Sequence, residues 1–319
     1  MAKSGQKLSA ETVAEIVRMT GERKSQREIA RKVGVAPSTV CDVQRKNRKD
    51  ADASESKANK SGRKAAAQCP DAEPATYSQY RLERPGHWLV LGDVHVPYHD
   101  RATVEAAVRQ AKRDAVVGVV LNGDTLDSHE ISSHDKDPSA PRYVREIEVA
   151  NQFLAWVRSQ LPKAEVVFTE GNHEARLSKY IMGRAPALFD LEFVNLRSLL
   201  HFADHGIVEV RDKRVIKAGK LHLIHGHEYQ GGGGVNPARW LYLRARSMAM
   251  CGHFHRTSEH HARDIGQKYE ATWSVGCACQ LSPAYAPLNE WNHGFAMLEL
   301  GDDESFAVRN MRVLGGKVL

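Results

Sequence analysis

Hydrophobic and polar positions change their pattern along the 319-residue chain. From residue 87 onward, short apolar runs alternate with segments whose apolar positions repeat at the helical period. The apolar runs predict strands at 88–91, 116–121, 166–169, 221–224, 249–250, 271–276, 295–300 and 305–313. The amphipathic segments predict helices at 101–113, 142–161, 174–182, 186–200 and 236–246. Strands that alternate with helices are typical of an α/β layered fold.

Residues 8–48 carry shorter helical patterns and predict three helices. Ser9 is expected to cap the first helix. Residues 25–28 read Ser-Gln-Arg-Glu, the sequence of a capping box, and begin the second helix. Gly34 supplies the following turn, and Pro37 suits the first turn of a third helix. We therefore predict a small all-α module at the N-terminal end.

Residues 50–84 are rich in Ala, Ser, Lys, Asp and Gln and contain few large apolar side chains. Such a segment cannot bury enough surface to order itself, so we predict a flexible linker. The chain is then expected to have three parts: a helical module at 1–49, a basic linker at 50–84, and an α/β domain at 85–319.

The positive charge is concentrated near the N-terminal end. Residues 1–84 hold 18 basic and 11 acidic side chains, a net charge of +7, whereas the remaining residues carry −1. This asymmetry indicates a module that meets a polyanion. No apolar run is long enough to span a bilayer or to form a signal peptide, so we expect a cytoplasmic protein without a membrane partner.

The segment QREIARKVGVAPSTVCDVQRK at 26–46 resembles the helix-turn-helix of transposases and small repressors. The resemblance implies DNA as a partner, with groove-facing residues and phosphate contacts on the third helix. Those residues are Pro37, Ser38, Thr39, Asp42, Gln44, Arg45 and Lys46. Ala36 departs from the pattern, because a capping Ser is common there. The alternative is a helical hairpin for protein contact or dimerisation, and the oligomeric state is left open.

Five polar clusters each follow a predicted strand. Their sequences are GDVH at 92–95, GDTLD at 123–127, GNHE at 171–174, HGH at 225–227 and GHFH at 252–255. In α/β sheets ligands bind beyond the carboxyl ends of the strands, so these clusters are expected to share one edge. The glycines allow sharp turns at those ends.

These motifs, in this order, resemble the calcineurin-like metallophosphoesterase superfamily from about residue 87 to residue 256. The resemblance implies a four-layer α-β-β-α sandwich, preceded here by the small all-α helix-turn-helix domain. It also implies two divalent metal ions, one held by Asp93, His95 and His255 and the other by Asn172, His225 and His253, with Asp124 bridging both. Imidazole and carboxylate donors together suit Mn²⁺, Fe or Zn²⁺ better than Ca²⁺. We expect Mn²⁺, with Fe, Zn²⁺ or Ni²⁺ as alternatives.

The resemblance implies hydrolysis by attack of a metal-bound hydroxide on phosphorus. His173 would then act near the leaving-group oxygen as an acid or orienting donor, and Asp127 would orient His173. Four further side chains are substrate-binding candidates or plain polar loop residues. These are Arg176, Arg256, His99 and His129.

Protein phosphatases of this superfamily usually have G-D-x-x-D-R-G, but Ser128-His129 follow Asp127 here. The missing arginine weakens the case for phosphoprotein substrates. The sequence GDTLDSHEISSHDKDP at 123–138 looks closer to phosphoesterases of bacteriophage and prophage genomes. We therefore expect a hydrolase of phosphodiesters or phosphomonoesters directed to nucleic acid, including a nuclease. The alternatives are a small-molecule or nucleotide phosphatase or phosphodiesterase, and a DNA-binding regulator with an inactive phosphoesterase domain.

Overall fold

The computed structural model describes residues 8–22, 24–49, 69, 71–73 and 77–319. The chain divides into two compact units, Met1–Ala75 and Thr76–Leu319. Most of the predicted linker at 50–84 lies outside the described residues. Its last part is packed, because Tyr80–Arg81 form strand β1 and Leu82 is buried in the core of the second unit. The second unit therefore begins before residue 85.

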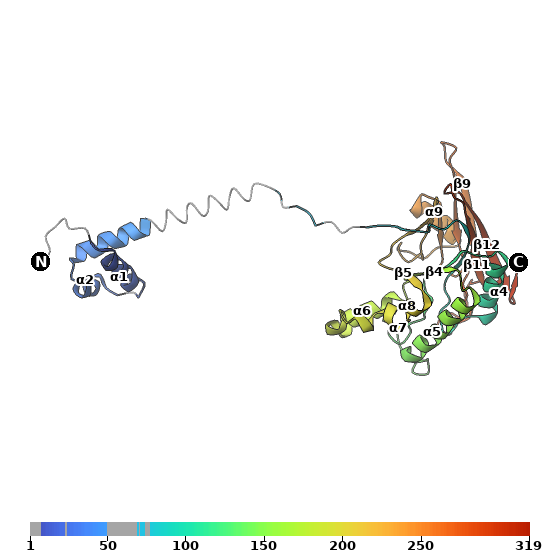
Figure 1. Cartoon of the computed structure of the whole chain (residues 1–319), viewed down its shortest axis with the longest axis horizontal. Coiled ribbons are helices and arrows are strands. Elements are labelled where there is room, and N and C mark those ends of the chain that lie inside the picture. Colours follow the sequence, from blue (N-terminus) through green and yellow to red (C-terminus); the bar gives the residue numbers. More distant parts are fainter. Residues whose placement is uncertain (1–7, 23, 50–68, 70, 74–76) are drawn as a thin grey trace. The chain divides into compact units, whose positions relative to one another are not determined.

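The first unit consists of α1 (Ala10–Gly21), α2 (Gln26–Val33) and a further helical stretch at 37–49 (Figure 1). The predicted caps are confirmed: the Ser9 side chain accepts from the amide of Thr12, and Ser25 forms the capping box. Gly34 ends α2 with a φ of 74°, which favours glycine. Its small core consists of Ile16, Met19, Ile29, Ala30 and Val40.

The second unit contains two sheets. The seven-stranded sheet has the order β13-β12-β11-β2-β3-β4-β5. Its parallel strands are β2 (Gly86–Leu91), β3 (Gly118–Asn122), β4 (Glu165–Thr169) and β5 (Ile207–Val210). Its antiparallel strands are β11 (Gly294–Leu300), β12 (Phe306–Leu314) and β13 (Lys317–Val318).

The six-stranded sheet has the order β1-β6-β7-β8-β10-β9. Its other strands are β6 (Ile216–Ala218), β7 (Leu221–Leu223), β8 (Ala249–Cys251), β9 (Ser258–Arg263) and β10 (Tyr269–Ser274). β7, β8 and β10 run parallel, whereas β9 pairs antiparallel with β10 and β6 pairs antiparallel with β7 and parallel with β1. Both sheets therefore carry parallel strands whose carboxyl ends can supply a site.

The helices of this unit are α4 (Arg101–Arg113), α5 (Tyr143–Gln160), α6 (Ala175–Arg184), α7 (Leu196–Leu199), α8 (Phe202–His205) and α9 (Pro237–Ala245) (Figure 1). The helix predicted over 186–200 was wrong as one element. It is broken into the short turns Pro186–Leu188 and Glu192–Val194 before α7, because Leu191 and Asn195 are extended and Asn195 caps a new turn. Among the described residues, no helix combines the length and hydropathy that a membrane crossing needs.

Three buried clusters hold the second unit together. The first joins α4 and α5 to one face of the seven-stranded sheet, as Val104 and Leu154 pack with Leu121. The second joins the opposite face to the six-stranded sheet, where Trp88 is fully buried with Leu223. The third places α9 on the six-stranded sheet. The strand ends are thus fixed from both sides by hydrophobic packing.

Candidate metal centre

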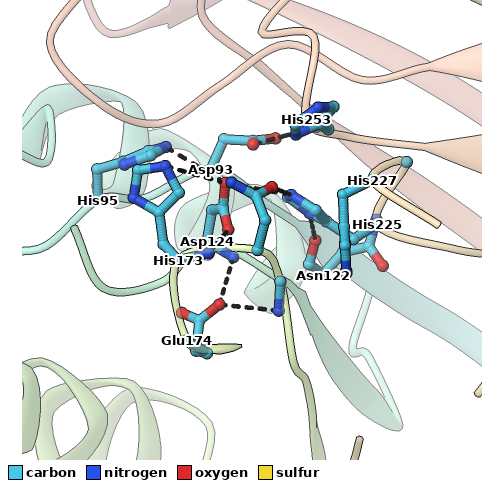
Figure 2. A network of polar contacts seen from close by, with 12 residues as sticks. Asp93, His95, Asn122, Asp124, His173, Glu174, His225, His227 and His253 are labelled. Carbon is cyan, nitrogen blue, oxygen red and sulfur yellow. Dashed lines mark hydrogen bonds and ion pairs between the residues drawn. The ribbon is translucent and has the colours of Figure 1, made fainter. Parts of the chain in front are cut away.

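Five strand ends place the candidate ligands. Polar clusters follow β2, β3, β4, β7 and β8, and the structure brings their side chains together in one group (Figure 2). In Figure 2, Asp124 lies in the middle of the group, with His95 and His173 on one side and His225 on the other. The group therefore combines residues from both sheets of the second unit.

The backbone at these ends is held in an uncommon conformation. Five of the seven predicted ligands have a positive φ: Asp93 (53°), His95 (49°), Asp124 (49°), His253 (67°) and His255 (57°). Such a conformation costs roughly 1–3 kcal/mol for each residue and persists only where surrounding structure enforces it. Concentration of the strain at the strand ends is typical of a functional site.

Three acceptor atoms, from Asp124, Asn172 and His225, lie close together. The Nδ1 of His225 donates to the main-chain oxygen of Asn122 at 2.8 Å, so its Nε2 carries a lone pair when the ring is neutral. That Nε2 lies 3.2 Å from Asp124 Oδ2 and 3.2 Å from Asn172 Oδ1. Three acceptors at this spacing are repulsive unless a proton or cation lies between them.

A second group of close ligand atoms comes from Asp93, His95 and His255. The Nδ1 of His95 lies 3.1 Å from Asp127 Oδ1, which leaves its Nε2 as the acceptor. This nitrogen is 3.3 Å from the Nε2 of His255, which is 3.2 Å from Asp93 Oδ1. The donor set again fits a cation.

Two of the compact donor groups share Asp124. Asp93, His95 and Asp124 offer ligand atoms that all lie within 4.8 Å of one another, and so do Asp124, His225 and His253. The structure thus brings together all seven predicted ligands and allows a bridging carboxylate between two ions. Carboxylate, amide and imidazole donors suit a divalent transition metal.

The electrostatics of the group favour positive charge. Burial disfavours protonated His225, but the Asp124 and Asp93 carboxylates outweigh burial and hold its pKa well above the ordinary value. Burial also acts to raise the pKa of Asp124, but His225 and His173 outweigh it and lower that pKa well below the usual range. The buried carboxylate is therefore ionised and available to a cation.

The contact between His173 and Asp127 uses the main-chain oxygen of Asp127, whereas we expected its carboxylate. The Nδ1 of His173 donates to the main-chain oxygen of Asp127 at 2.7 Å, whereas the carboxylate Oδ1 is 3.8 Å away and bonds His95 instead. Arg176 donates to the same main-chain oxygen at 2.7 Å and to His173 Nε2 at 3.0 Å. Burial lowers the pKa of His173 to about 4. Neutral His173 therefore presents an acceptor at Nε2, and Arg176 supplies the N–H groups beside it.

Several supporting residues were missed by the sequence reasoning. The buried Glu174 accepts from the amides of Asp124 (2.9 Å), Gly171 (2.8 Å) and Leu126 (2.9 Å). Gly171 is necessary there, since a Cβ would collide with Asp124. Glu228 accepts from the amide of His225 at 2.9 Å. The final Glu of the GNHE motif was a signal for the first contact, but main-chain partners leave little trace in a sequence.

The substrate-binding candidates separate in space. Arg176 lies within the site, and His129 lines a cavity that also includes His95 and Asp127. His99 instead faces a different cavity beside α4 and α5. Arg256 pairs with Glu290 and the main-chain oxygen of Gly234. Arg256 is therefore engaged by these two partners, and His99 lines a cavity whose wall includes none of the predicted metal ligands.

The residues predicted to contact DNA all lie on the helical stretch at 37–49. Most of them are exposed, and Arg45 pairs with Asp42 at 3.2 Å. Gln44 differs, because its amide donates to Thr20 at 2.8 Å and accepts from Gln26 at 3.0 Å. Gln44 thus ties this helix to α1 and α2.

Residues 87–256, more than half of the chain, match the calcineurin-like phosphoesterases. The chain belongs to the calcineurin-like phosphoesterase family, whose members are typically metal-dependent. No curated protein matches the sequence.

Similar solved structures include vacuolar protein sorting 29 from Cryptosporidium parvum, with 13% identity over 74% of this chain and 95% of that one and a TM-score of 0.39. The phosphoesterase YfcE from E. coli has 15% identity over 70% of this chain and 98% of its own, with a TM-score of 0.33. Vps29 from Chaetomium thermophilum has 13% identity, coverages of 72% and 97%, and a TM-score of 0.31.

Proposed function

We propose that this protein is a two-metal phosphoesterase that hydrolyses phosphodiester or phosphomonoester bonds. The observation that carries the proposal is that two groups of candidate ligands share the buried carboxylate of Asp124. Within each group, the ligand atoms all lie within 4.8 Å of one another. Two bound cations would neutralise the phosphoryl oxygens and lower the pKa of a water. We propose Mn²⁺ as the metal, with Fe, Zn²⁺ or Ni²⁺ as alternatives.

The chain's own residues have distinct tasks in this proposal. Asp93, His95 and His255 would hold one metal ion, and Asn172, His225 and His253 would hold the other, so that the ions supply the positive charge that binds the substrate phosphate. Arg176 donates toward the developing charge from its place beside His173. His173 is kept neutral by burial, so it orients this guanidinium and accepts hydrogen bonds through Nε2. Asp127 fixes both His95 and His173.

We further infer that the first unit is a helix-turn-helix that directs the enzyme to DNA in the cytoplasm. Support comes from the three short helices, the glycine turn at Gly34, and the exposed Arg45 and Lys46. The net charge of +7 in residues 1–84 favours a polyanion. The three cores of the second unit support a four-layer α-β-β-α arrangement. The phage-type origin stays a prediction from residues 123–138.

The test is hydrolysis by the metal-stripped full chain after Mn²⁺ is restored. Bis-p-nitrophenyl phosphate reports diester cleavage, and p-nitrophenyl phosphate reports monoester cleavage. We expect activity that depends on Mn²⁺ and that is lost in Asp124→Asn, with Glu259→Gln as an exposed-carboxylate control. If neither ester is hydrolysed with any divalent metal, the proposal fails and the DNA-binding regulator takes its place. Hydrolysis of nucleotides without any affinity for DNA would favour the small-molecule alternative.

A further inference from the structure

A cavity of about 650 Å³ opens beside the metal ligands. His95 and Asp127 form part of its wall, so a molecule within it lies against the first donor group. Tyr98, Tyr285 and Trp291 supply aromatic rings to the same wall. The volume is in the range of roughly 300–1,000 Å³ that is typical of small-molecule sites.

One aromatic side chain of this wall is largely exposed. Tyr285 lines the cavity but is 71% exposed, and its ring centroid lies 6.3 Å from that of Trp291. Trp291 packs edge-on against the ring of His255 at 4.1 Å, which ties this wall to a metal ligand. The Tyr285 side chain is therefore largely exposed in a wall that adjoins a metal ligand, so its ring is accessible to a bound molecule.

Polar groups border the aromatic surface. Gln280, Ser282 and Asp137 line the cavity together with His129. These side chains include both hydrogen-bond donors and acceptors. A ligand that matches the cavity has a flat π face for stacking and a polar edge for hydrogen bonds, and it is joined to a phosphate. A nucleotide combines all three features.

We propose that this cavity binds the base of a nucleotide whose phosphate lies at the metal ligands. The inference rests on the proposed phosphoesterase function and narrows its substrate class. The base must be unpaired and unstacked to reach the Tyr285 ring, so the substrate is single-stranded, terminal or flipped out rather than an intact duplex.

A second cavity narrows the proposed type of phosphoester further. It has a volume of about 610 Å³ and includes the opposite ligands Asn172 and His253. Its lining includes the basic side chains Lys179 and Lys213 and the acidic side chains Glu170 and Asp212. A phosphodiester has two substituents and can place one in each cavity, with the base on the aromatic side. A monoester would leave one cavity empty, so the arrangement favours a diester.

The test compares thymidine 5′-monophosphate with inorganic phosphate by calorimetric titration of the Mn²⁺-loaded full chain. We expect the nucleotide to bind more tightly, because base stacking on an aromatic ring is worth roughly a five- to hundredfold change in affinity. Tyr285→Ala should remove this advantage and leave the affinity for inorganic phosphate as it was. Tyr285→Phe keeps the ring and should keep the advantage. Tyr180→Ala, at an exposed tyrosine of α6, is the matched control.

Equal affinities for the nucleotide and phosphate in the unchanged protein would overturn the base site. So would a Tyr285→Ala variant that lowers both affinities equally, since the ring would then act on the phosphate or the fold. If the protein binds the nucleotide more tightly than phosphate but hydrolyses no ester, the proposed function is overturned and the base site is supported. Ester hydrolysis without base-dependent binding would overturn the site alone.

Discussion

In four histidines of the site, Nδ1 contacts another group of the protein. This contact determines whether Nε2 donates or accepts a hydrogen bond. His225 and His173 donate to main-chain oxygens, His95 faces the Asp127 carboxylate, and His255 faces Cys279 Sγ at 3.8 Å. Their side-chain types and strand-end positions could be predicted from the sequence. The tautomers could not, because the partners of His225 and His173 are carbonyl groups that any residue supplies.

Glu146 of α5 is a buried carboxyl with a testable pH effect. It accepts from the amide of Ser128 at 2.6 Å, and burial raises its pKa to about 8 from the ordinary 4.5. The folded state therefore binds an extra proton between these pH values. This contribution to stability is fully present below pH 4.5 and is lost as the pH rises through about 8.

Glu146→Gln keeps an acceptor for Ser128 and removes the titration. Between pH 5 and pH 8 the free energy of unfolding of the parent should fall relative to that of the variant. The relative slope is at most about 1.4 kcal/mol per pH unit. Urea unfolding of both proteins at several pH values measures it. Parallel pH profiles would show that Glu146 ionises normally in the folded protein.

At the scale of elements, the sequence pattern was most informative where a helix or strand has a clear periodic signal. α4 was predicted with its observed bounds, because apolar positions repeat along it and Asp100 caps it. β9 was missed, since its SEHHAR sequence alternates between half-buried and exposed positions and has a single apolar residue, Ala262. β1 was missed because two residues pair with β6 far along the chain. Long-range pairing of this kind has no local signature.

Glu174 joins the loops that follow β3 and β4, so its removal should loosen two ligand loops together. Glu174→Gln keeps one oxygen and places an NH₂ against an amide donor. Each unsatisfied buried donor costs about 1–3 kcal/mol of unfolding free energy. Loss of such a supporting contact typically lowers metal affinity by about 10–100-fold. Thermal unfolding and Mn²⁺ titration should both change, whereas Glu259→Gln should change neither. Unaltered Mn²⁺ affinity would argue against this positioning of the loops.

At the scale of the whole molecule, the excess positive charge and the candidate metal ligands lie in different parts of the sequence. The two units have separate cores, and the candidate metal ligands all lie in the second. The charge asymmetry and the motif order could be read from the sequence. The start of the second unit could not, because Leu82 enters its core from a segment whose composition predicted a linker.

Deletion of residues 1–75 leaves β1 in place and removes the first unit. The truncated protein should hydrolyse bis-p-nitrophenyl phosphate as the full chain does but bind DNA much more weakly. Its DNA affinity should also depend less on salt, because fewer phosphate contacts remain. Fluorescence anisotropy with labelled DNA at several salt concentrations measures both. DNA affinity that survives the deletion would place the nucleic-acid site in the second unit.

The most direct test of the two-metal account is a stepwise titration of the stripped full chain with Mn²⁺, in which bound metal and diester hydrolysis are measured on the same samples. We predict two ions per chain, with activity that rises as the second ion binds. Asp124→Asn should lose more metal affinity than the roughly 10–100-fold typical of an outer supporting residue. Full activity with one ion or none, or a variant that still binds two ions as tightly, would contradict the account.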